Sequence, residues 1–223
     1  MGYDISYAKY MDHTVLKADT TKETLKRFCD EAKEYGFASV CVNPANIPYV
    51  AGQLRGTKVK ACSVIGFPLG ANTTVMKVME TLEAVKNGAQ EVDMVINVGA
   101  LKDKDYAYVK KEIVAVVEAA HPQAEVKVII ETCLLTDEEK VTVCRMAKEA
   151  GADFVKTSTG FGSRGATAED VRLMKEAVGD MRVKASTGIN NRKICDEMLA
   201  AGACRMGTSK GIFIVKDEEP NLK

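Results

Sequence analysis

The sequence predicts a single α/β domain folded as a (β/α)8 TIM barrel. Short strand-like runs alternate with helix-like runs along the 223 residues, and one phrase recurs in which a helix ends at glycine just before a strand. No linker, low-complexity stretch or change in composition divides the chain. An open doubly wound sheet is the competing architecture, but eight strand–helix units without a second domain are more typical of a closed barrel.

The recurring phrase appears as EYGFASVCVN, KNGAQEVDMVIN, EAGADFVKTST and AAGACRMGTS. A glycine just past the end of a helix adopts the left-handed conformation that closes it. Successive phrases are roughly 50 to 60 residues apart, which is about two strand–helix units. The predicted helix-closing glycines are Gly36, Gly88, Gly151 and Gly202.

The remaining strand-like runs fill the gaps between these phrases and bring the number of predicted strands to eight. They are KYMDHT at 9–14, KVKACSVIG at 58–66, VKVIIET at 126–132 and MRVKAS at 181–186. The predicted domain covers residues 1–223, with a short N-terminal segment at 1–8 and a frayed, charged C-terminal tail at 216–223.

The intervening helices carry start signals of their own. Thr20 with Glu23, and Thr136 with Glu139, have the spacing of capping boxes, in which a threonine and a glutamate satisfy the first backbone N–H groups of a helix. Met76 and Met79 stand at helical spacing, which predicts that both belong to the core.

Composition excludes several classes of function. Lys plus Arg equals Asp plus Glu at 31 each, which argues against a nucleic-acid partner and against an anionic membrane surface. No apolar run approaches the roughly 20 residues of a membrane-spanning helix. Seven cysteines without a CxxC pair indicate free thiols and a cytoplasmic location, and two histidines are too few for a zinc site. We therefore expect no metal and no cofactor.

Three charged residues stand where a strand should be buried. Asp93 lies in the middle of EVDMVIN, and Lys156 and Lys184 each end an apolar run. In a barrel the C-terminal ends of the strands form the active-site face, and an unpaired buried charge costs several kcal/mol. One lysine could pair with Asp93 as a structural salt bridge while the other reaches solvent, but three such charges together favour catalysis.

Two lysines and a carboxylate, without histidine or metal, are typical of amine nucleophile chemistry. An ordinary lysine has a pKa near 10.4, so only about one molecule in a few thousand is neutral at pH 7. Burial and a neighbouring cation both favour the neutral amine, and adjacent strands lie about 4.8 Å apart. The neutral amine can form a Schiff base with a carbonyl, and the carboxylate can move protons. Spacing alone leaves open which lysine is the nucleophile.

The glycines Gly160, Gly162 and Gly165 match the GxGxxG pattern of a dinucleotide-binding turn. In a dinucleotide fold this turn follows the first strand directly, whereas here five strands precede it and Thr157–Thr159 intervene. We interpret the segment as a flexible loop over the mouth of the barrel, where glycines allow the backbone to approach a ligand.

An anion-binding site is predicted near the end of the chain. Gly188 follows the seventh strand, and Gly207 and Ser209 belong to the segment GTSKG after the eighth, before a short apolar run. Loops after strands seven and eight commonly hold phosphate in barrels. An ordinary capped turn is the alternative.

From about Lys9 to Val215 the chain resembles the 2-deoxyribose-5-phosphate aldolases of the short bacterial type. The resemblance is carried by YMDHTVLK, FASVCVNP, VIGFPLGA, EVDMVINVGAL, KVIIETCLLT, GADFVKTSTGFG, VKAS and the GTS near the end. It implies a class I aldolase, without metal or cofactor, that reversibly cleaves 2-deoxy-D-ribose 5-phosphate to acetaldehyde and D-glyceraldehyde 3-phosphate. It also suggests a homodimer.

The resemblance implies roles for individual residues. Lys156 would form the Schiff base, Lys184 would keep that amine uncharged, and Asp93 would relay protons. Thr159, Gly188 and Ser209 match positions that line the substrate or its phosphate, and Asp12 and Cys41 match positions at the floor of the pocket.

Three departures from the family pattern concern the phosphate. Thr187 replaces a common glycine, Arg164 lies in the glycine-rich loop, and Lys210 stands where a small hydroxyl residue is common. Arg164 or Lys210 would add positive charge to the site. Two other functions remain open from the residues alone: a phosphosugar isomerase with Asp93 as base, and a barrel that only binds a phosphorylated metabolite.

Overall fold

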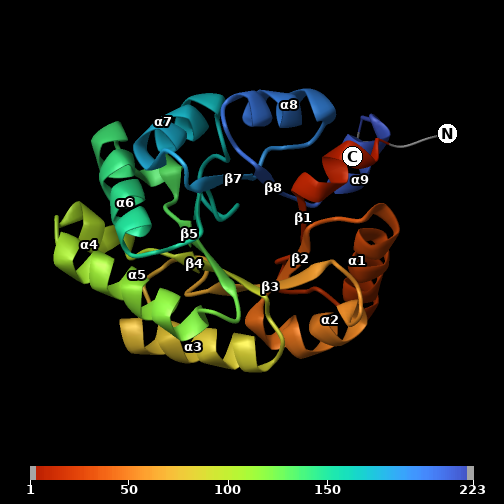
Figure 1. Ribbon diagram of the computed structural model, residues 1–223, viewed down its shortest axis with the longest axis horizontal. Coiled ribbons are helices and arrows are strands. Elements are labelled where there is room, and N and C mark those ends of the chain that lie inside the picture. The colour runs from red at the N-terminus through yellow and green to blue at the C-terminus, as the bar shows by residue number, and fades with distance from the viewer. Residues whose placement is uncertain (1–3, 220–223) are drawn as a thin grey trace.

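The computed structural model describes residues 4–219, so part of the predicted N-terminal segment (1–3) and part of the predicted tail (220–223) lie outside the described residues. Eight parallel strands pair in chain order and close into a barrel, β8 pairing with β1. Figure 1 shows the helices arranged around these strands. The predicted (β/α)8 barrel is confirmed.

The strands are short, and each predicted strand is present. They are β1 (Met11–Thr14), β2 (Ser39–Val42), β3 (Lys60–Ile65), β4 (Glu91–Val95), β5 (Glu125–Ile129), β6 (Phe154–Lys156), β7 (Arg182–Ser186) and β8 (Arg205–Thr208).

The helices that follow the strands include a short one after β8, as expected. They are α1 (Lys22–Tyr35), α2 (Ile47–Leu54), α3 (Thr74–Lys86), α4 (Val98–Lys102), α5 (Tyr106–Ala120), α6 (Asp137–Glu149), α7 (Ala168–Val178), α8 (Arg192–Ala200) and α9 (Gly211–Lys216). Within the part of the chain that the structure describes, 3-10 helices span Ile5–Tyr10, Pro44–Asn46 and Thr132–Leu134. Among the helices of residues 4–219, none combines the length and apolar character needed to cross a membrane.

Local capping explains where most of these helices begin and end. The capping box of Thr136 and Glu139 is confirmed at the start of α6. The box predicted at Thr20 is wrong by one residue: Thr21 caps α1, because the Thr20 hydroxyl instead donates to the carbonyl of Lys17 and closes the preceding turn. The glycines predicted to follow helix ends all have positive φ angles: Gly36, Gly88, Gly151 and Gly202.

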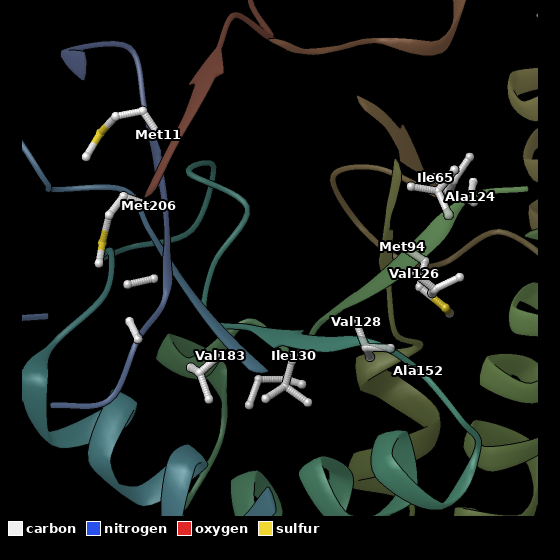
Figure 2. Packing of buried hydrophobic residues seen from close by; sticks show 14 of the residues in the cluster. Met11, Ile65, Met94, Ala124, Val126, Val128, Ile130, Ala152, Val183 and Met206 are labelled. Carbon is white, nitrogen blue, oxygen red and sulfur yellow. The ribbon is translucent and has the colours of Figure 1, made fainter. Parts of the chain in front are cut away.

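Alternation along the strands separates an apolar outer layer from an interior that is largely charged, apart from a small cluster of Cys41, Cys62 and Val64 on β2 and β3. On β4, Val92 and Met94 are fully buried in the main hydrophobic core, whereas Glu91 and Asp93 occupy the alternate positions. Figure 2 shows part of the apolar layer, including Met94, Val126 and Val183. Burying each such side chain stabilises the fold by about 1.5–3 kcal/mol, so the register of the strands is strongly fixed.

The prediction that Met76 and Met79 belong to the core is wrong. Their exposed fractions are 55% and 57%. Helix α3 instead buries Lys77, Thr81 and Ala84. These residues follow one another at helical spacing on a different face of the helix from Met76 and Met79. The methionine pattern fitted a helix, but it could not tell which face of that helix meets the barrel.

The buried face of α3 is fixed by an ion pair. Lys77 Nζ lies 2.8 Å from Glu112 Oε2 and donates to the carbonyl of Val95 at 2.8 Å. Glu112 on α5 also accepts from the backbone N–H of Asn97 at 3.1 Å. Burial lowers the pKa of Lys77 and raises the pKa of Glu112, and their mutual attraction opposes both shifts. The pair therefore joins two helices to the end of β4.

We predict that Lys77→Met destabilises the protein by about 3–5 kcal/mol, because it leaves the Glu112 carboxylate buried without its cation. The free energy of unfolding, measured by denaturant titration, tests this. The double variant Lys77→Met with Glu112→Gln should recover at least half of the loss. A single variant within about 1 kcal/mol of the parent would contradict the prediction.

Candidate active site

Charged side chains fill the interior of the barrel. Among the described residues, seven of them contact one another there and are at most 9% exposed, and we call them the buried charge cluster. Its members come from six strands: Asp12, Glu91, Asp93, Lys127, Lys156, Lys184 and Arg205.

Asp93 lies at the centre of this cluster. Its Oδ2 accepts from the ammonium groups of Lys156 at 2.7 Å and Lys184 at 2.8 Å, and its Oδ1 accepts from Lys127 at 2.9 Å. Burial favours the neutral acid, but attraction to Lys127 and then to the other two lysines holds the pKa of Asp93 well below its usual range. Asp93 is therefore a carboxylate that three lysines share.

The two predicted lysines lie side by side. Lys156 on β6 and Lys184 on β7 are directly paired positions of neighbouring strands, and both amines reach the same oxygen of Asp93. Sequence reasoning placed the two amines close together but did not place a carboxylate oxygen between them. That oxygen reduces the repulsion that the sequence alone suggested.

The surroundings of the two lysines differ. Lys184 Nζ also lies 2.6 Å from Asp12 Oδ2, whereas among the described residues Lys156 is paired with Asp93 alone. Burial by itself lowers the pKa of Lys184, but attraction to Asp12 and then Asp93 outweighs it and raises the pKa above its usual range. Lys184 is consequently a fixed cation.

Sequence reasoning did not identify three members of the cluster: Glu91, Lys127 and Arg205. Lys127 Nζ contacts Glu91 Oε2 at 2.5 Å, and Arg205 contacts Glu91 Oε1 at 2.8 Å and Asp12 Oδ1 at 2.6 Å. A usable signal was present, since Lys127 alternates with valines in VKVIIET and therefore points away from the apolar layer.

The cluster holds four cations and three carboxylates, so one positive charge is in excess when every group is ionised. Lys127, Lys184 and Arg205 each contact two carboxylates. Lys156 contacts one, which it shares. Lys156 is therefore the cation of the cluster with the fewest carboxylate contacts.

Residues at the ends of β7 and β8 line one side of the barrel mouth. Gly188 has φ 85° and open space where a Cβ would stand. Gly207 lies within β8, and a Cβ there would collide with Ser186 and approach Lys184, so packing beside Lys184 requires this glycine. Ser209 lines a cavity of about 530 Å³ between the end of β1, α1 and α9.

The interior thus combines a buried lysine, a carboxylate and a second, fixed cation at the mouth of a barrel. Comparison with known proteins shows which family has this arrangement of residues in its sequence. The family model described as DeoC/LacD family aldolase matches residues 6–215. The chain belongs to this aldolase family.

Its relatives are similar along nearly their whole length. A deoxyribose-phosphate aldolase from Aciduliprofundum boonei is 58% identical over 214 residues, covering 95% of this chain and 96% of the relative. One from Clostridium tetani is 59% identical over 212 residues, covering 95% and 98%. The solved structure of the aldolase QR15 superposes with a TM-score of 0.90 at 44% identity, covering 95% of each chain.

In this aldolase, the basic departures Arg164 and Lys210 have partners of their own. Arg164 Nη1 lies 2.5 Å from Asp170 Oδ2 on α7, and Asp170 also pairs with Lys140 at 2.7 Å. The ammonium of Lys210 lies 5.6 Å from the centre of the Phe213 ring. Arg164 is therefore held at the start of α7, which weakens the idea that it adds charge to a phosphate site.

The aldolase interior also brings possible metal ligands together. Within residues 4–219, Cys41, Cys62 and Asp93 offer ligand atoms that all lie within 4.8 Å of one another. The Lys127 ammonium lies 2.9 Å from Asp93 Oδ1 and 3.6 Å from Cys62 Sγ, so a metal ion would have to displace it. The geometry suits the lysine cation better than a second cation.

Thr187 has a backbone conformation that glycine adopts more readily than threonine. Its φ of 73° lies in the left-handed region, where a β-branched residue is strained by about 1–3 kcal/mol. Its carbonyl accepts from the N–H of Ala166 at 3.1 Å, and Gly160 and Gly165 pack closely against it. The loop after β6 therefore packs against a residue with a strained backbone.

We predict that Thr187→Gly stabilises this aldolase by about 1 kcal/mol, because relief of strain exceeds the added entropy of the unfolded chain. Gly188→Ala is the matched control: it has room for a Cβ at φ 85° and should cost about 1 kcal/mol through strain alone. Denaturant unfolding measures both changes. A less stable Thr187→Gly would show that the threonine side chain contributes more than its strain costs.

Proposed function

We propose that the chain catalyses the reversible cleavage of 2-deoxy-D-ribose 5-phosphate to acetaldehyde and D-glyceraldehyde 3-phosphate through a lysine Schiff base. The observation that carries this proposal is the contact of Lys156 and Lys184 with one oxygen of Asp93 at the mouth of the barrel. Support comes from relatives named deoxyribose-phosphate aldolase that are 57–59% identical to this chain.

Lys156 is the proposed nucleophile. It ends β6, at the face of the barrel where active sites form, and its side chain is 3% exposed. It is also the cation of the buried charge cluster that contacts only one carboxylate. Lys184, held as a cation by Asp12 and Asp93, would oppose a second positive charge beside it.

The proposed steps need only side chains of this chain and water. The Lys156 amine adds to the C1 carbonyl of the open-chain sugar, and loss of water leaves an iminium. The C2–C3 bond breaks, its electrons move into the iminium to give an enamine, and the C3 hydroxyl gives up its proton as the new aldehyde forms. Protonation of the enamine and hydrolysis release acetaldehyde. Asp93, next to the amine, is the proposed proton relay.

The substrate's phosphate is proposed to bind at the loops after β7 and β8. Gly188 and Ser209 lie in these loops and Gly207 lies near the end of β8, all on the side of Lys156 that faces Lys184. Thr159, three residues beyond Lys156, is proposed to line the sugar. Asp12 and Cys41, which project into the barrel, are proposed to lie beneath it.

We predict that borohydride with acetaldehyde irreversibly modifies the protein and adds the reduced two-carbon group to the peptide containing Lys156, as mass spectrometry can determine. Lys156→Ala should abolish both trapping and turnover, because the amine is the covalent partner. Asp93→Asn should fold and be trapped but turn over at least about 100-fold more slowly.

These outcomes separate the aldolase from its alternatives. An isomerase that uses Asp93 as base, or a barrel that only binds a phosphorylated metabolite, would not be modified. Modification of Lys184 with Lys156 unlabelled would reverse the proposed roles of the two lysines.

We further propose that the protein works as a homodimer in the cytoplasm. The seven cysteines are all free, as expected in a reducing compartment. Helix α3 exposes an apolar stripe on its outer face, formed by Val75, Met76, Met79 and Leu82. A second copy of the chain would cover this stripe. The relative from Aeropyrum pernix, described as tetrameric, is 32% identical with a TM-score of 0.88, covering 95% of this chain and 90% of that one.

We predict that Met79→Glu shifts the protein to a monomer in analytical ultracentrifugation, because a carboxylate in the stripe opposes burial. Glu118→Lys on α5 is a control that changes charge at another exposed site and should leave the sedimentation coefficient unchanged. A monomeric parent protein, or a dimer insensitive to Met79→Glu, would count against this interface.

A further inference from the structure

Glu131 is a buried carboxylate that the proposed chemistry does not use. It follows β5 at the mouth of the barrel and is 5% exposed, yet no lysine, arginine or histidine among residues 4–219 pairs with it. A buried carboxylate without a cation is uncommon, because its charge must be satisfied by hydrogen bonds alone.

The Cys133 thiol donates one weak hydrogen bond to Glu131 Oε1 at 3.8 Å, and the others come from Thr159. Its backbone N–H lies 3.3 Å from both oxygens of Glu131, and its hydroxyl donates to Glu131 Oε2. The Thr159 hydroxyl in turn accepts from the N–H of Phe161 at 3.0 Å. Since a hydroxyl has one proton and two lone pairs, the hydroxyl can offer a ligand only its remaining lone pair. It is set up as an acceptor.

The backbone of Glu131 is strained to reach this arrangement. Its φ and ψ of 53° and 68° lie in the left-handed region, which a non-glycine residue occupies at a cost. The loop closes over the carboxylate at Gly162, where a Cβ would come within 3.3 Å of Glu131 Oε1. Strain that the surrounding contacts maintain is characteristic of functional sites.

The pair also faces a space that a ligand can enter. Glu131 and Thr159 are the polar side chains in the lining of a cavity of about 230 Å³, whose other walls include Leu69, Val95 and Phe161. An apolar cavity with a small number of oriented polar groups is the usual form of a small-molecule subsite.

We propose that Glu131 is a positioning residue for the aldol cleavage: it orients the Thr159 hydroxyl as the acceptor for a hydroxyl group of the sugar. The proposal rests on the proposed function. It confines the role of Glu131 to the hydroxylated substrate, because acetaldehyde has no hydroxyl group for Thr159 to accept.

Two reactions of the same enzyme test this. One is cleavage of 2-deoxy-D-ribose 5-phosphate; the other is exchange of the methyl hydrogens of acetaldehyde with D2O, which needs the Lys156 Schiff base and no sugar hydroxyl. In Glu131→Gly, which tolerates the positive φ, kcat/KM for cleavage should fall about 10- to 100-fold, whereas acetaldehyde exchange stays within about twofold. Glu131→Gln keeps the size of the side chain and should show the same split, less strongly.

Matched variants locate the effect. Thr159→Val should show the same split, and the double variant with Glu131→Gly should lose little more than either single variant, because the two residues act as one unit. Cys133→Ala removes a neighbour whose Sγ lies 3.8 Å from Glu131 Oε1, and should leave both reactions within about twofold of the parent.

Any other result would contradict the proposed role of Glu131. Equal losses in both reactions would make Glu131 a purely structural residue of the loop, and unchanged cleavage would show that Thr159 needs no orientation. If Glu131→Gly does not fold, Glu131→Gln decides by the same comparison. Failure of the parent protein to exchange or trap acetaldehyde would instead refute the proposed function, independently of the variants.

Discussion

The carboxylate of Asp93, shared by three lysines inside the barrel, is the interaction on which the site depends. Without it, the ammonium groups of Lys127, Lys156 and Lys184 would repel one another in a medium where charge is poorly screened. With it, the cluster remains one carboxylate short of balance. That shortage, rather than simple repulsion between two lysines, distinguishes Lys156, because every other cation of the cluster contacts two carboxylates.

The closed barrel makes such a cluster possible. Alternation along each strand gives the outer positions to the apolar layer of Figure 2 and leaves the inner positions for charge. Closure then brings Asp12 on β1 against Arg205 on β8, although 193 residues separate them. Burial of the apolar layer offsets the free-energy cost of burying these charges. The same layer fixes the strand register, and the register determines where each inward side chain lies along the barrel axis.

Sequence alone predicted the barrel and four members of the cluster. Strand alternation and the ends of apolar runs pointed to Asp93, Lys156 and Lys184, and the family resemblance pointed to Asp12. It did not predict the partners, since Glu91 and Lys127 find each other only through the pairing of neighbouring strands. The error at Met76 and Met79 has a similar origin. Helical spacing fits either face of α3. The face that packs against the barrel carries Lys77, and a fully buried lysine is unexpected from sequence unless its partner, here Glu112, is known.

Backbone strain lies on both sides of Lys156. Glu131 at the end of β5 and Thr187 at the end of β7 both have left-handed φ angles, and β6 runs between these strands. Glu131 holds Thr159, while Thr187 supports Gly160, Gly165 and Ala166. The loop that follows the lysine is therefore clamped from both neighbouring strands. Backbone strain at Glu131 and Thr187 lowers the stability of the protein, but the contacts of these two residues restrict the conformations of the loop where the substrate must be placed. The strain and the charge imbalance therefore affect the same short segment around Lys156.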